Sequence, residues 1–113
     1  MTVIVAGTLD FDPADADDCI MSAREHIEGA YGLPGCIHYS FSLDPFNPGR
    51  AYVFMQWVSE DDLAAYFESP WYLAMRNHLG KFGLKGAWLE KFKADLVEPL
   101  YADNGKAKPY FFD

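Results

Sequence analysis

Short apolar runs and one-sided apolar stripes alternate along the chain, and the first of them predict a strand and then a helix. Residues 2–10 are rich in β-branched side chains and too few for a buried helix, so they predict a strand. Asp12 suits a helix N-cap and Pro13 the first helical position. Apolar residues then recur at helical spacing, which predicts one helix that ends at Gly32. They are Ala16, Ile20, Ala23, Ile27 and Ala30.

Two further strands are predicted on either side of a loop rich in proline, glycine and asparagine. In residues 36–43 the odd positions are apolar and the even positions are more polar, so we expect one face of this strand to be buried. Residues 51–58 are apolar on both faces except at Gln56, which is typical of a strand inside a covered sheet. Residues 44–49 have the chemistry of a hairpin loop.

Two helical stretches are predicted next. Ser59 and Asp62 form a capping box, with aspartate at the reciprocal position, that begins the first stretch. Ser69 and Pro70 suit the N-cap and first position of a second stretch, which runs to about Gly80.

The remainder predicts one more strand and a tail. Residues 81–86 contain two glycines and predict a loop, and residues 88–98 predict the final strand. We therefore expect one domain over residues 2–98 and a C-terminal tail over residues 99–113. The tail carries three consecutive rings, Tyr110, Phe111 and Phe112.

The order β-α-β-β-α-β predicts an α+β, ferredoxin-like fold: a four-stranded antiparallel sheet with both helices on one face. The opposite face would carry Tyr52, Phe54 and Val58 or their alternates. A large apolar face exposed to water marks an interface. We therefore expect a homodimer that packs two such open sheet faces together around a two-fold axis.

Composition agrees with one soluble core and excludes several partners. The chain has 113 residues, half of them apolar and 17% aromatic, with a formal net charge of −8. That charge argues against nucleic acid and against a polybasic membrane patch. The first eleven residues resemble neither a signal peptide nor a membrane span. Cys19 and Cys36 are expected as free thiols of a reducing, cytoplasmic compartment.

An ordered set of motifs resembles the antibiotic biosynthesis monooxygenase (ABM) family over about residues 2–97. The motifs are Pro34-Gly35-Cys36, the hairpin DPFNPGR at residues 44–50, Trp57, SEDDL at residues 59–63, and Ser69-Pro70 with Tyr72. The resemblance implies a dimeric α/β-barrel that is often cytoplasmic. It also implies, for some members, oxidation of phenols, naphthols or quinols by molecular oxygen without a metal or flavin.

Related proteins degrade haem, and their pattern differs from this chain. That branch uses an asparagine in the first strand, a tryptophan in the helix and a histidine one helical stretch later. The corresponding positions here are Gly7, Tyr66 and Arg76. All three depart from the pattern, which argues against haem degradation.

Four aromatic residues are candidates for substrate contacts. Trp57 shares a strand face with Ala51 and is either a core residue, which the pattern favours, or a wall of a cavity between sheet and helices. Tyr66, Trp71 and Tyr72 lie on or beside the helical stretches, where buried hydroxyl and indole groups need polar partners. A substrate oxygen is one such partner, and packing alone explains them equally well.

Three charged or titratable residues are candidates for catalysis. His38 lies on the more polar side of its strand and suits a general base only if that side faces the cavity. His78 and Arg76 are two residues apart on one helical stretch, so at most one points inward. An inward Arg76 would stabilise a phenolate or superoxide, although the pattern favours an outward one.

The sequence contains no recognisable metal, nucleotide or hydrolase motif. The three histidines are scattered without metal-ligand spacing, so no metal and no cofactor are expected. The leading hypothesis is a cofactor-independent monooxygenase that acts on a phenol- or quinol-like compound with molecular oxygen. The alternative is a non-catalytic dimer that binds a small hydrophobic or aromatic ligand.

Overall fold

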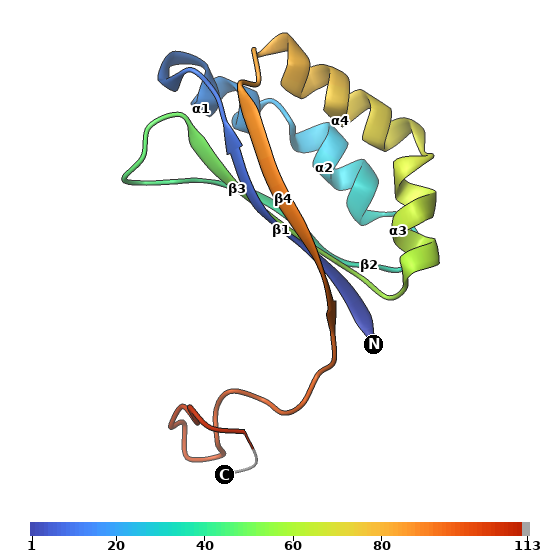
Figure 1. Ribbon diagram of the computed structural model, residues 1–113, viewed down its shortest axis with the longest axis vertical. Helices are drawn as coiled ribbons and strands as arrows, with labels where there is room; N and C mark the ends of the chain where they lie inside the picture. The colour runs from blue at the N-terminus through green and yellow to red at the C-terminus, as the bar shows by residue number, and fades with distance from the viewer. Residues whose placement is uncertain (112–113) are drawn as a thin grey trace.

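The structure is a computed structural model that describes residues 1–111 and contains four strands and four helices (Figure 1). In chain order they are β1 (Thr2–Asp10), α1 (Pro13–Met21), α2 (Arg24–Tyr31), β2 (Cys36–Leu43), β3 (Arg50–Trp57), α3 (Glu60–Phe67), α4 (Pro70–Lys81) and β4 (Gly86–Ala94). The end of the predicted tail, with Phe112, lies outside the described residues. No helix in residues 1–111 is long and apolar enough to cross a membrane.

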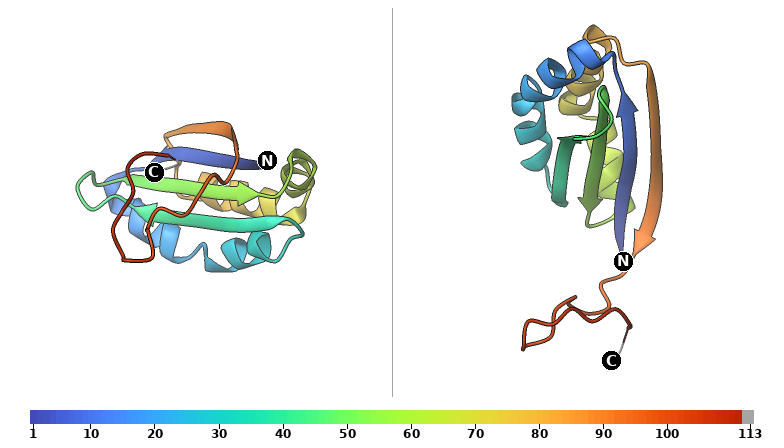
Figure 2. Two further views of the ribbon diagram at one scale, coloured as in Figure 1. Left: turned by 90° about the horizontal axis from the view of Figure 1, so that it is seen from below. Right: turned by 90° about the vertical axis from the view of Figure 1, so that its left-hand side faces the viewer.

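The strands form one antiparallel sheet in the order β2-β3-β1-β4, and the helices all lie on one of its faces (Figure 2). This is the predicted ferredoxin-like α+β arrangement, with a helical pair in place of each single helix. Val5 pairs with Met55, and Gly7 pairs with Leu89. This register decides which side chains of each strand face the helices.

The core lies between the sheet and the helices, and it follows the period of the strands. Every second residue of β3 is buried, and Trp57 at its end has no exposed surface. In β1, Val3, Val5 and Leu9 are buried on the same face. The helices contribute the buried side chains that meet them, which include Ala16, Cys19, Leu63, Tyr66 and Met75. Burial raises the pKa of the Cys19 thiol to about 11, so this free cysteine stays protonated near neutral pH.

The single helix expected between Asp12 and Gly32 is broken into α1 and α2. The Ser22 hydroxyl donates a hydrogen bond of 2.5 Å to the carbonyl of Asp18, one turn earlier. Serine back-bonding of this kind competes with the helical ladder and bends helices. Ala23 is completely buried at the break, so the bend keeps the second half of the apolar stripe against the core.

The final strand begins and ends earlier than residues 88–98. Ala94 pairs with Thr2 at one end of β1 and Gly86 pairs with Asp10 at the other. Because Thr2 is the first residue of β1, residues after Ala94 have almost no part of β1 left to pair with, and β4 ends there. The three predicted helix starts are confirmed, because Asp12, Ser59 and Ser69 each accept a hydrogen bond from a backbone N–H of the first turn.

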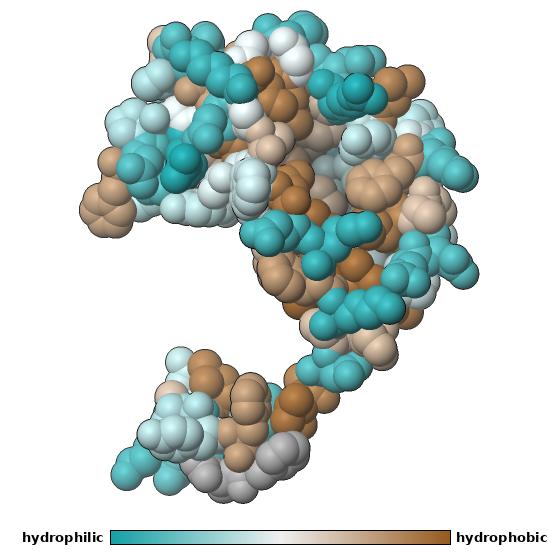
Figure 3. Space-filling model, viewed as in Figure 1, coloured by the Kyte–Doolittle hydropathy of each residue, from teal (hydrophilic) through white to brown (hydrophobic). Residues whose placement is uncertain are grey.

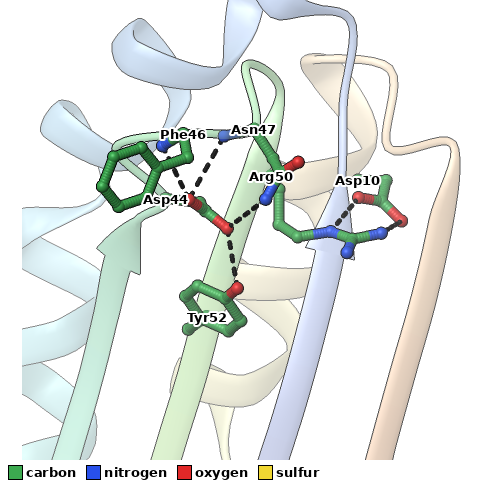
Figure 4. Close-up of polar contacts among 6 residues, drawn as sticks. All are labelled: Asp10, Asp44, Phe46, Asn47, Arg50 and Tyr52. Carbon is green, nitrogen blue, oxygen red and sulfur yellow. Dashed lines mark hydrogen bonds and ion pairs between the residues drawn. The ribbon is translucent and has the colours of Figure 1, made fainter.

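The β2–β3 hairpin is held by Asp44 (Figure 4). Its carboxylate accepts hydrogen bonds from the Tyr52 hydroxyl at 2.6 Å, from the Asn47 amide at 2.8 Å and from the Phe46 N–H at 2.8 Å. These donors, Tyr52 first, hold the pKa of Asp44 well below its usual range. Beside it, Arg50 makes a two-pronged ion pair with Asp10 on β1, with nitrogen–oxygen distances of 2.9 and 3.3 Å.

A C-terminal arm, residues 95–111, leaves the end of β4 and extends away from the sheet (Figure 1). The radius of gyration is 16.0 Å, against about 13 Å for a compact domain of this length. The arm is therefore not packed into the body of its own chain.

Candidate functional site

A cavity of about 240 Å³ lies between the inner face of the sheet and helix α4. Its lining comes from all four strands and from α3 and α4, and it is almost entirely apolar or aromatic. The lining residues are Leu9, Tyr39, Phe41, Val53, Met55, Tyr66, Tyr72, Met75, Arg76, Leu79, Leu84, Ala87 and Leu89. This volume exceeds the roughly 150 Å³ of an engineered cavity that holds benzene, so the space admits a small aromatic molecule.

The polar feature of the wall is a pair of buried phenols. The hydroxyl oxygens of Tyr39 on β2 and Tyr66 on α3 lie 2.5 Å apart and share a hydrogen bond. Burial raises the pKa of Tyr66 to about 12, and burial raises that of Tyr39 further still. Both phenols are therefore neutral near pH 7. The shared bond is a further cause of each shift, because it raises the pKa of Tyr39 and lowers that of Tyr66.

Three more rings position this pair. Trp57 stacks on Tyr66 with centroids 5.2 Å apart and planes 21° apart. Tyr72 on α4 meets Tyr66 edge to face at 5.5 Å, and Phe67 meets Tyr72 in the same way at 5.0 Å. The indole N–H of Trp57 is buried and has no hydrogen-bond partner among residues 1–111. Trp57 is therefore a core residue that does not line the cavity itself but packs behind Tyr66, which does.

Arg76 supplies the only charge in the described lining of the cavity. It follows the buried Met75 on α4, yet Arg76 itself is exposed, so the cation lies where the cavity opens to solvent. Beside this opening, β4 lies at the edge of the sheet, contributes Ala87 and Leu89 to the lining and makes few contacts with the helices. An anionic group that enters the cavity therefore meets Arg76 at the mouth.

The structure places neither candidate histidine in the cavity. His38 is exposed on the open face of the sheet, where its ring lies 6.2 Å from Phe54. His78 faces α1 instead, and its Nε2 lies 2.8 Å from the Cys19 carbonyl, to which it must donate. The ring of His26 lies 5.1 Å from that of His78 and completes this structural contact. The cavity lining contains no histidine and no carboxylate.

Trp71 also lies away from the cavity. It is half-buried and packs against Gly29 on α2, where an added Cβ would lie 2.2 Å from the indole ring. The sequence-predicted site residues that the structure brings together are therefore Tyr66, Tyr72 and Arg76, with Trp57 behind them.

Tyr39 is the polar residue that sequence reasoning did not place in the site. Its signal was present, because alternation had put it on the apolar face of its strand with Phe41. A tyrosine on the buried face of a strand needs a partner for its hydroxyl, and that partner is the phenol of Tyr66.

Gly7 occupies a position that admits no side chain. A Cβ at Gly7 would lie 1.9 Å from the carbonyl oxygen of Trp88 on β4. The asparagine of the haem-degrading pattern therefore cannot be accommodated at this backbone position. Among residues 1–111 no cluster of three histidine, cysteine, aspartate or glutamate side chains could hold a metal ion.

A second and wider hollow of about 480 Å³ lies between α3 and the far half of β4. It is lined by Val3, Glu60, Leu63, Ala64, Phe67, Lys91, Phe92 and Lys93. It is larger than the first cavity, but three charged residues lie in its lining, and two of them, Glu60 and Lys93, already pair at 3.7 Å. The aromatic cavity, which holds buried polar groups, is the better candidate site.

Comparison with known proteins agrees with this architecture. The model of the antibiotic biosynthesis monooxygenase family matches residues 2–78. An uncharacterized protein of Synechocystis sp. is 29% identical over 70 residues, which is 62% of this chain and 48% of that protein. The match thus spans about half the length of that relative.

Solved structures share the fold at low sequence identity. A Deinococcus radiodurans protein classed with the antibiotic biosynthesis monooxygenases superposes with a TM-score of 0.77 at 15% identity, over 90% of this chain and all of that one. The protein Rv0793 of Mycobacterium tuberculosis gives 0.71 at 20% identity, over 87% and 98%. A conserved protein of Methanosarcina mazei gives 0.75 at 17% identity, over 84% and 94%.

The family model covers more than half of the chain, and the motifs that suggested the resemblance all lie within its limits. Family membership supports a general monooxygenase-like or small-molecule-binding role. On these grounds the chain belongs to the antibiotic biosynthesis monooxygenase family.

Proposed function

We propose that this protein oxidises a phenol- or naphthol-like compound to a quinone with molecular oxygen, without a metal or flavin. The observation that carries the proposal is the cavity wall itself. A neutral phenol pair, Tyr39 and Tyr66, faces an apolar space whose mouth holds the cation of Arg76. An electron-rich aromatic anion is the kind of ligand that such a wall favours.

Ionisation of the substrate is the first requirement. The lining offers no histidine or carboxylate to remove the phenolic proton, so the proton leaves to water at the mouth. Arg76 favours the resulting anion by direct charge attraction. The hydroxyls of Tyr66 and Tyr72 are within the wall and serve as hydrogen-bond donors that hold the anionic oxygen.

Oxidation then proceeds through the substrate. The phenolate transfers one electron to oxygen, which gives a substrate radical and superoxide. The two radicals combine at a ring carbon that bears hydrogen, and a carbon–oxygen bond forms. Loss of water from the peroxide breaks the oxygen–oxygen bond and leaves a carbonyl, so one oxygen atom enters the quinone and the other becomes water. The apolar cavity excludes bulk water from the radicals during this step.

Oxygen consumption and quinone absorbance test the proposal directly, with metal-free protein and a panel of naphthols and anthrones. We expect turnover in the native protein and a loss of about tenfold or more in kcat/KM for Arg76→Met. Asn77→Met, on the exposed surface of the same helix, is the matched control and should retain activity. Absence of turnover with every compound in the panel would overturn the proposal.

A second function is supported by a specific observation, namely that both candidate histidine bases lie outside the cavity. A non-catalytic protein that binds a small aromatic ligand needs the same walls and no base. Calorimetric binding of a naphthol without oxygen consumption would favour this function over catalysis.

The proposed assembly is a homodimer through the open sheet face. Four rings project from this face with between 38% and 72% of their surface exposed: Tyr52, Phe54, Trp88 and Phe92. Apolar exposure on this scale is typical of an interface. Sedimentation of the native protein and of Phe54→Asp would test it, because a buried charge at the centre of the face should dissociate the dimer.

A further inference from the structure

The C-terminal arm is a built element with its own hydrogen bonds. Tyr101 forms a bridge with Ala107, and the N–H of Lys108 donates to the carbonyl of Leu100 at 2.8 Å. The Lys108 ammonium also lies 3.2 Å from the Glu98 carboxylate, and both groups are largely buried, with 24% and 19% of their side chains exposed. The arm is therefore preorganised while it stands away from the domain.

This preorganised arm displays apolar side chains to solvent. Five large ones have between 57% and 91% of their surface exposed: Leu96, Leu100, Tyr101, Tyr110 and Phe111. A protein monomer rarely leaves so many large apolar groups together without a partner. The exposed surface of the arm therefore has the apolar character of a protein interface.

The arm projects on the side of the sheet that has no helices (Figures 1 and 2). It leaves the end of β4 and turns below the open face, so that the arm and the sheet enclose a hollow (Figure 3). The open face carries the rings of Tyr52, Phe54, Trp88 and Phe92. Two apolar surfaces of one chain therefore border the same space.

The area of these surfaces is sufficient for a stable dimer. At about 200 Å² for each ring, the exposed parts of the four sheet rings offer roughly 400 Å². A stable complex of standard size buries about 800 Å² on each partner. Counted at the same area each, the exposed parts of the five apolar side chains of the arm add roughly 700 Å², which brings the total above about 800 Å². The apolar area of the sheet face alone is smaller than a stable complex buries on each partner, whereas the area of the sheet face and the arm together is large enough.

We propose that the arm is a clasp that closes on a second copy of this chain. In a two-fold dimer each body fills the hollow of the other, so each arm meets the partner's body and both apolar surfaces are covered at once. This inference rests on the homodimer put forward under Proposed function and adds the element that holds it. A dimer without the clasp would bury too little surface to persist at low concentration.

Truncation provides the first test. Chains that stop after Asp95 retain the complete sheet and lose the arm. We expect the native protein to sediment as a dimer and the truncated one to show a dimer dissociation constant raised at least 100-fold. The variant Leu100→Ser/Tyr101→Ser should weaken the dimer in the same direction, while Asp103→Asn on the same arm should not. An unchanged dissociation constant after truncation would overturn the clasp.

A cross-linking test identifies which body the arm touches. The photoreactive residue p-benzoylphenylalanine replaces Tyr101 in a mixture of ¹⁵N-labelled and unlabelled chains. We expect cross-linked peptides of mixed isotopic composition, because the arm meets the partner. Cross-links within one chain only, or none at all, would overturn the proposal. Naphthol binding and turnover by the truncated protein report on the cavity separately, so failure of the clasp and failure of the proposed chemistry are distinguishable.

Discussion

Tyr66 lies face to face with Trp57, with ring centroids 5.2 Å apart and planes 21° apart, so the polar wall of the cavity rests on the most deeply buried ring of the core. The same tyrosine holds its hydroxyl 2.5 Å from that of Tyr39. Stability and site geometry are therefore coupled through one side chain. Changes to these rings should affect both, in proportions that can be measured separately.

Replacing Trp57 by leucine should destabilise the fold by about 2–4 kcal/mol, because it leaves a cavity under Tyr66. Urea unfolding followed by circular dichroism measures the loss. Leu73→Ala, on the exposed side of α4, should change the free energy of unfolding by no more than about 0.5 kcal/mol. Equal losses in the two variants would contradict the central place given to Trp57.

Removing either phenol hydroxyl should cost about 1–3 kcal/mol, because the other hydroxyl is then buried without its partner. Tyr39→Phe and Tyr66→Phe should each show this loss in urea unfolding. The double variant should lose less than the sum of the two, since the second change removes a group that is already unpaired. Strict additivity would show that the 2.5 Å contact contributes nothing to stability.

The phenol pair also predicts how stability depends on alkaline pH. The pKa of Tyr66 is raised by burial to about 12, from the 10 of an exposed phenol, so the folded state retains a proton that the unfolded state loses. The contribution of the protonated Tyr66 to the free energy of unfolding is complete below pH 10 and is lost as the pH rises from 10 through 12. The expected loss is on the order of 2 kcal/mol. Urea midpoints measured across this range check it, and Tyr39→Phe/Tyr66→Phe should flatten the dependence.

Asp44 predicts the opposite dependence at acid pH. Its pKa is held below its usual value, by the Tyr52 hydroxyl first, so its contribution is complete above the ordinary 3.8 and is lost as pH falls below it. Asp44→Asn should therefore lower the urea midpoint at pH 7 and have less effect at pH 3. Asp103→Asn, on the arm, serves as the control and should show no such change between the two pH values.

Gly7 and Gly80 form a matched pair for testing backbone space. A Cβ at Gly7 would lie 1.9 Å from a backbone oxygen, whereas a Cβ at Gly80 in α4 would meet nothing within 4 Å. Gly7→Ala should destabilise the protein by more than about 2 kcal/mol, because backbone must move. Gly80→Ala should stabilise it by about 0.5–1 kcal/mol through helix propensity. Thermal unfolding of the two variants should therefore shift in opposite directions.

The sequence predicted the fold because local signals agreed with it. Alternation in β2, capping at Ser59 and Ser69, and the continuous apolar run of β3 each pointed to the element that formed. The break at Ser22 was missed, because alanine and isoleucine continue the helical stripe across it and only the serine side chain interrupts the ladder.

The site was harder to predict, because it depends on which way side chains turn and on contacts between distant segments. Tyr66 on α3 and Tyr72 and Arg76 on α4 line the same cavity, as the sequence hypothesis required. His78 is on α4 too, but its ring turns to the Cys19 carbonyl of α1, 59 residues away in the sequence. Tyr39 joins the site through a bond to Tyr66, which no local pattern specifies.

Ala87 and Leu89 line the cavity from β4, an edge strand that makes few contacts with the helices. A larger or smaller residue at either position would reshape the cavity without disturbing the packing between β1, β3 and the helices. Selection for a new aromatic compound could therefore act on this strand while the rest of the protein stays constant. Because β4 is an edge strand with few helix contacts, substitutions on it can change ligand specificity with little effect on the core.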